Sequence, residues 1–156
     1  MSNQLEGLLA VLARVEDTNF NKWLTDTQRE LPQLLSDPAY VQSILDNSFD
    51  KNVSWLQLGN SYDWVGSLVK NRLIPEDAFL DVYAFRVIQA WEMMAPITVL
   101  ARHDVGDAIW ENFEYLYIRA SQWSAQHRDS NYPKHVPRAK LPAFETVISS
   151  RADSVL

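Results

Sequence analysis

The longest apolar stretch of this chain, residues 78–101, constrains its fold more than any other feature. Its length approaches that of a membrane span, but Asp81, Arg86, Glu92 and Pro96 lie inside it, and each is costly in hydrocarbon. The rest of the stretch is apolar on almost every side, which in a soluble protein requires neighbours on several sides. We therefore predict that it forms the central helix of a soluble core and that the chain has no membrane span.

Elsewhere, apolar residues recur at three- and four-residue spacing, the period that gathers side chains on one face of a helix. Proline removes a backbone donor inside a helix, so the second helix is expected to end just before Pro32. Together with the central helix, these stripes predict an all-α fold, a single antiparallel bundle of about five or six helices. The stripes cover residues 3–15, 20–31, 38–45, 55–69 and 109–123.

Gly59 and Gly66 lie seven residues apart inside the predicted helix 55–69. Each weakens a helix by about 1 kcal/mol relative to alanine, and so needs a compensating reason to be there. The compensation we expect is the close approach of another helix on that face.

Length and proline content divide the chain into two parts. A chain of 156 residues is long enough for one hydrophobic core, which we assign to a helical domain over residues 1–130. Pro133, Pro137 and Pro142 then interrupt the pattern, and only a short period returns near residue 144. Residues 131–156 are therefore predicted to be a tail that is extended or contains one short helical turn.

The charge of the chain limits its partners. A net charge of −6 argues against a phosphate backbone or an anionic membrane surface as partner, so no nucleic acid is expected. Only residues 131–156 are basic overall, with four basic and two acidic side chains. The basic stretch of this tail could touch an acidic partner or RNA, although a solvated tail that complements the acidic N-terminal half is the favoured interpretation. Its members are Lys134, His135, Arg138 and Lys140.

Two further features bear on chemistry and compartment. The chain has no cysteine, which excludes disulfides, thiolate metal sites and cysteine nucleophiles. Its first residues include the acid Glu6 and lack the positive segment that precedes a secretory signal, so a cytoplasmic location is expected.

Arg86 and Glu92 are the first candidates for a site, because they are charges in the most apolar part of the chain and charges are seldom buried unpaired. Arg102, directly after the same stretch, is a further candidate for a buried polar residue. The favoured alternative is that each charge finds a partner on a neighbouring helix or reaches the surface.

Glu111 and Glu114 are the second candidates, because a three-residue spacing places both carboxylates on the same side of a helix. Carboxylate metal sites in bundles add a Glu-x-x-His pair, and no glutamate of this chain has histidine three residues later. No metal and no cofactor are therefore predicted. His103, Asp104 and Asp107 cluster at a helix junction, where helix capping is the favoured interpretation.

Aromatic side chains of the last two long helices could line a ligand pocket, since clefts between bundle helices are common binding sites. Packing in the core is the favoured alternative. The five aromatic residues are Trp91, Trp110, Phe113, Tyr117 and Trp123.

Several segments together resemble a bacterial all-helical domain of unknown function, some members of which follow a transmembrane helix. The resemblance covers about residues 50–125 and implies an all-helical fold, but it supplies no catalytic residue. This chain differs from the membrane-linked members because no span is predicted. The matching segments are Ser61-Tyr62-Asp63-Trp64-Val65-Gly66, Leu68-Val69-Lys70, Phe79-Leu80-Asp81-Val82-Tyr83, Trp91-Glu92, Pro96, Arg102 and Trp110-Glu111-Asn112-Phe113-Glu114-Tyr115-Leu116.

No nucleophile elbow, phosphate loop or dinucleotide fingerprint is present in the sequence. The favoured hypothesis is therefore a non-catalytic module for protein interaction or ligand sensing, with a protein partner or a second copy of the chain. The alternative is a small metal-dependent or acid/base hydrolase that uses the carboxylates of the last long helix.

Overall fold

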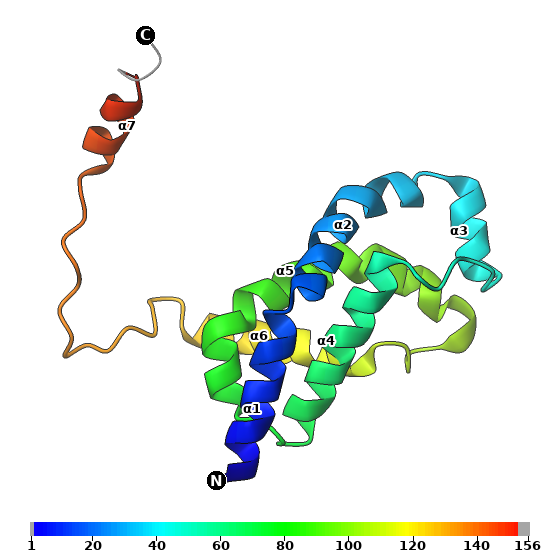
Figure 1. Cartoon of the computed structure of the whole chain (residues 1–156), viewed down its shortest axis with the longest axis horizontal. Helices are drawn as coiled ribbons and strands as arrows, with labels where there is room; N and C mark the ends of the chain where they lie inside the picture. The colour runs from blue at the N-terminus through cyan, green and yellow to red at the C-terminus, as the bar shows by residue number, and fades with distance from the viewer. Residues whose placement is uncertain (1, 153–156) are drawn as a thin grey trace.

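A computed structural model describes residues 2–152 of the chain, which form seven helices and no strand. This confirms the all-helical fold predicted from the sequence. Six of the helices make up the body of the molecule, and the seventh lies apart from them at the end of the tail (Figure 1). The helices are α1 (Ser2–Val15), α2 (Thr18–Leu35), α3 (Pro38–Leu45), α4 (Ser54–Lys70), α5 (Glu76–Val105), α6 (Glu111–Gln126) and α7 (Phe144–Ala152).

Local capping sets the start of α3, where the side chain of Asp37 accepts a hydrogen bond from the Ala39 amide at 2.9 Å. The prediction that the second helix ends before Pro32 is wrong, because α2 continues through this proline to Leu35. An internal proline costs about 3 kcal/mol, and burying a leucine returns about 1.5 to 3 kcal/mol. Leu31 is buried, and Leu34 and Leu35 pack against the core, so their burial offsets the lost hydrogen bond.

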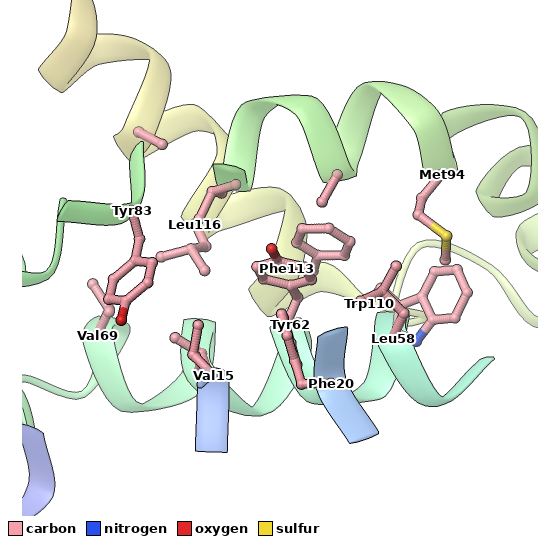
Figure 2. Packing of buried hydrophobic residues seen from close by; sticks show 14 of the residues in the cluster. Val15, Phe20, Leu58, Tyr62, Val69, Tyr83, Met94, Trp110, Phe113 and Leu116 are labelled. Carbon is pink, nitrogen blue, oxygen red and sulfur yellow. The ribbon is translucent and has the colours of Figure 1, made fainter. Parts of the chain in front are cut away.

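The core is centred on the crossing of α4 and α6. The ring of Tyr62 stacks on that of Phe113 with 4.7 Å between centroids, and Phe20 of α2 meets the Tyr62 ring edge-on at 5.2 Å (Figure 2). The close approach predicted from the two glycines is confirmed. A Cβ at Gly66 would overlap the backbone of Asn112, and one at Gly59 would overlap the indole of Trp110.

Helix α5 is bent around α6 rather than straight. Glu76 and Arg102, near its two ends, pair with Arg119 and Glu114 of α6. In a straight helix these two residues of α5 would lie about 39 Å apart, whereas their partners are about 7.5 Å apart along α6. Long side chains cannot span that difference, so the helix must curve. Within residues 2–152, no helix is long and apolar enough to cross a membrane.

The tail leaves the body of the molecule at the end of α6. Residues 128–143 have no regular helix, and α7 follows as a nine-residue helix, longer than the single turn expected (Figure 1). Residues 153–156 of the predicted tail lie outside the described residues. Every side chain described between residues 128 and 149 is exposed.

Candidate functional site

A pocket of about 630 Å³ opens at the end of the bundle where the α3–α4 connection meets the α5–α6 corner. Its volume is in the range of pockets that bind small molecules or side chains of a partner. We call it the Trp110 pocket. Most of its wall is apolar, and its lining residues are Ile44, Leu45, Asp46, Asn47, Phe49, Lys51, Trp55, Leu56, Asn60, Asp63, Leu100, Ala101, Asp104, Val105, Ala108, Ile109 and Trp110.

Trp110 forms one wall of this pocket and has an unusual backbone. Its φ of 53° and ψ of 36° place a bulky residue in the left-handed region, which costs of order 1–3 kcal/mol. The surroundings hold it there: the indole lies against Gly59, and its Nε1 donates to Asn60 Oδ1 at 2.9 Å. Its ring also meets that of Trp55 edge-on, with 6.0 Å between centroids. The wall is therefore formed before any ligand arrives.

Asp63 of α4 fixes the start of α6 beside this wall. Its Oδ1 accepts hydrogen bonds from the backbone amides of Asn112 at 3.0 Å and Phe113 at 3.1 Å, and its Oδ2 accepts from Asn112 Nδ2 at 3.1 Å. It thus acts as an N-cap from another helix, because Trp110, at the N-cap position, makes no side-chain cap bond. The expectation that Asp107 caps a helix is therefore wrong for the start of α6.

The sequence does not predict the capping role of Asp63, because helix caps are predicted from polar side chains directly before the helix that they cap. The spacing of 49 residues between Asp63 and Asn112 leaves no local signal. One indirect signal existed: Asp63 lies between the two glycines that mark the α6-facing side of α4.

The polar groups of the Trp110 pocket are mainly acidic. Asp46, Asp63 and Asp104 contribute carboxylates, and Lys51 is the only basic side chain among the lining residues. The Lys51 ammonium lies 3.4 Å from the centroid of the Phe49 ring and hydrogen-bonds Asn47, and it faces three carboxylates in the charge balance of the lining. The pocket is therefore an apolar cavity with a negatively charged rim.

The interpretation of Arg86 and Glu92 as buried charges is wrong, because both are exposed. Elsewhere on α5, Phe85 is 69% exposed and Val99 70% exposed, on a flank that no other helix covers. Arg86 and Glu92 line a smaller hollow of about 500 Å³ between α2 and α5. Arg86 also pairs at 3.5 Å with Glu16, in the turn that follows α1. Both charges thus reach the surface, as the favoured alternative predicted.

Glu16 also accepts a hydrogen bond from Tyr83 Oη at 2.9 Å, which ties α1 to α5. Burial, followed by this contact with a carboxylate, raises the pKa of Tyr83 to about 12. Burial likewise raises the pKa of Tyr62 in the core. Both phenols therefore stay neutral at physiological pH.

Glu111 and Glu114 are not brought together as a pair of acids. Glu111 is exposed and lies 3.7 Å from Lys70 of α4, whereas Glu114 pairs with Arg102 of α5. Arg102 is half-buried, and its Nε donates to the carbonyl of Ile109 at 2.9 Å. Its Nη2 lies 2.9 Å from Glu114 Oε2 without hydrogen-bonding geometry, so this contact is an ion pair only.

The residues around the α5–α6 corner form no metal site. His103 Nδ1 lies 2.8 Å from Asp104 Oδ1, and both side chains are exposed. Across the described part of the chain, no three His, Asp or Glu residues are placed to hold a metal ion.

The five predicted pocket aromatics have different places. Trp110 lines the pocket, whereas Trp91 stacks on Tyr117 at 5.6 Å and meets Phe113 edge-on at 5.1 Å in the core. Trp123 stacks on His127 near the end of α6, with 4.0 Å between ring centroids. Two pocket aromatics that the sequence reasoning did not single out, Phe49 and Trp55, contact each other with tilted rings and 5.0 Å between centroids.

Comparison with known proteins identifies one matching family model. A family model described as a domain of unknown function, DUF4760, matches residues 9–120. The match covers most of the chain and reaches further toward the N-terminus than the resemblance recognised in the sequence. No curated protein and no solved structure matches the chain.

Proposed function

The chain belongs to the DUF4760 family of domains of unknown function, and on this premise we propose that it is a binding module without catalysis. The Trp110 pocket takes an apolar group that carries a positive charge. In a cell, such a group is presented by a basic, apolar segment of a protein partner.

The single observation that carries this proposal is the strained backbone of Trp110 at the pocket wall. A bulky residue in the left-handed region persists only where the surroundings determine its conformation, and such residues cluster at binding sites and ligand clamps. Here Asn60, Gly59 and the Asp63 cap provide those surroundings. A pocket formed in advance loses less entropy when a ligand binds.

The lining of the pocket sets the chemistry of its ligand. Phe49, Trp55 and Trp110 contribute an aromatic wall, and aromatic side chains dominate the energetics of interfaces. The carboxylates at the rim repel anions and attract cations, so an ammonium or guanidinium attached to an apolar body fits both features. The same lining contains no serine, threonine or histidine and offers no nucleophile and base side by side, which supports binding rather than catalysis.

A titration with 4-phenylbutylamine tests the proposal, with 4-phenylbutyric acid as the matched anionic probe. The indole N–H resonances of Trp55 and Trp110 report on the pocket. The other four tryptophans serve as internal references, namely Trp23, Trp64, Trp91 and Trp123. The amine should shift the first two resonances saturably, with a dissociation constant on the order of 1 mM for so small a ligand. The acid should bind about tenfold more weakly.

Two substitutions complete the test. Ala108→Trp fills the pocket from an exposed loop position and should abolish the shifts, whereas Val99→Ser on the uncovered flank of α5 should leave them unchanged. Equal binding of amine and acid, or shifts of equal size at all six indoles, would contradict the proposal.

A further inference from the structure

The C-terminal tail carries apolar side chains that nothing in the described molecule covers. Leu141 is 84% exposed, Phe144 74% and Ile148 50%. In Figure 1 the tail runs away from the six-helix body, and α7 lies at its far end. Soluble chains seldom leave large apolar side chains so exposed in one segment unless the segment has a binding partner.

We propose that the tail is itself a ligand of the Trp110 pocket, and that it inserts into the pocket of a second copy of the chain. This inference rests on the proposed function, because it names the partner that the pocket takes. Two copies that exchange tails form a closed two-fold dimer in which each pocket is filled by the other copy.

The shape of the tail fits the pocket. Phe144 and Ile148 are four residues apart in α7 and so lie on one face of the helix. Insertion of apolar residues from one helical face into an apolar groove is a recurrent mode of peptide recognition. A phenylalanine side chain is smaller than the pocket volume of about 630 Å³, so the ring can enter the pocket and pack against its apolar wall.

The charge of the tail complements the rim of the pocket. Residues 131–156 carry four basic and two acidic side chains, whereas residues 1–130 carry ten basic and eighteen acidic ones. Arg138 and Lys140 directly precede the apolar anchors, and the pocket rim offers Asp46 and Asp104. Such complementarity steers association and favours this segment over an acidic one.

The geometry of the tail favours the pocket of a second copy over its own. Residues 130–138 form a closed turn in which Tyr132 Oη donates to the carbonyl of Pro137 at 3.1 Å and Arg138 Nη2 donates to Ser130 Oγ at 2.7 Å. Beyond this turn, six residues to Phe144 reach at most about 20 Å. The tail starts at the end of α6 that is opposite Trp110, about 25 Å away along the helix. A second copy has no such restriction.

Sedimentation of the full chain over a range of concentrations tests this inference. The unmodified chain should pass from monomer to dimer as its concentration rises. Phe144→Ser in the tail and Ala108→Trp in the pocket should each weaken the dimer by about tenfold or more. Val99→Ser, which also alters an exposed apolar position, should change it by less than about twofold.

Mixing the two weakened variants separates this mechanism from general damage. The intact tail of Ala108→Trp can enter the intact pocket of Phe144→Ser, so the mixture should associate more strongly than either variant alone. An unmodified chain that stays monomeric at all concentrations would overturn the inference, as would a mixture without recovery. If Phe144→Ser shifts the Trp110 indole resonance in the monomer, the tail occupies its own pocket and the second copy is the wrong partner.

Failure of the tail-exchange dimer can be distinguished from failure of the pocket as a binding site. Binding of 4-phenylbutylamine by a chain that never dimerises would leave the pocket a binding site and reject only the tail as its ligand. Absence of both amine binding and dimerisation would reject the two proposals together.

Discussion

The crossing of α4 and α6 and the C-terminal tail are the two extremes of this molecule. At the crossing, Gly66 lies against the backbone of Asn112 and Asp63 caps the neighbouring helix, so each part determines the position of the next. In the tail, Leu141 and Phe144 contact no core. The difference indicates where each region obtains its order: the crossing from contacts within the chain, and the tail, on our proposal, from a second chain.

The largest expected effect comes from filling the space at the crossing. Alanine normally stabilises a helix by about 1 kcal/mol over glycine, but Gly66→Ala would force the helices apart, and overpacking costs about 1 to 3 kcal/mol or more. We expect the free energy of unfolding, measured with urea, to fall by about 3 kcal/mol. An unchanged or higher stability would show that the crossing is looser than described.

The contact of Tyr83 with Glu16 tests whether α1 is fixed by contacts within the chain, as the crossing is, or is loosely held, as the tail is. The pKa of Tyr83 is raised from its ordinary value near 10 to about 12, so the folded state holds the phenol proton more tightly than the unfolded state. The contribution of the Tyr83 phenol to the free energy of unfolding is therefore fully present below pH 10. It is lost as the pH rises toward 12, which lowers the free energy of unfolding by about 2 kcal/mol.

Urea unfolding at pH 9 and pH 11.5 measures this loss. The variant Tyr83→Phe removes the titrating group and should lose visibly less stability than the unmodified chain between these two values. Equal losses in both proteins would mean that Tyr83 is not held by Glu16 and that α1 is bound as loosely as the tail.

The cap at the start of α6 is expected to have a smaller effect. Asp63→Ala leaves the amides of Asn112 and Phe113 without their acceptor, and loss of an N-cap typically costs about 1 to 2 kcal/mol. Asp107→Ala is the matched control, because Asp107 makes no cap bond to α6, and it should change stability by less than about 0.5 kcal/mol. If the two variants were equally destabilised, the cap would not come from α4.

The smallest effect on the fold itself is expected in the tail. Phe144→Ser changes a side chain that is 74% exposed, so the monomer should unfold within about 0.5 kcal/mol of the unmodified chain. Differential scanning calorimetry at low concentration provides the measurement. A clear loss of stability in the monomer would place Phe144 in the core rather than at a surface reserved for a partner.

The sequence predicted those parts of the fold that local pattern encodes. The glycine pair in α4 indicated a close helix crossing, and the prolines after α6 indicated a tail. The pattern could not show which face of α5 stays uncovered, because its apolar residues surround the helix and only tertiary packing selects among them.

The candidate site was less predictable for the same physical reason. The sequence indicates Trp110 as an aromatic pocket residue, but its left-handed backbone is imposed by Gly59 and Asn60 some 50 residues earlier in the chain. Phe49 lies in the connection between α3 and α4, where no helical periodicity of apolar residues marks it as part of a buried face. Contacts between distant segments form the pocket, and a single sequence read locally does not contain them.

Amide hydrogen exchange at two protein concentrations tests the central claim most directly. At low concentration, the amides of Phe113 and Leu116 should be protected to nearly the full free energy of unfolding, while those of residues 139–143 exchange like an unstructured chain. At high concentration, residues 141–148 and the pocket residues 104–110 should gain protection together. A tail that is protected at both concentrations, or that gains protection without the pocket, would contradict the account.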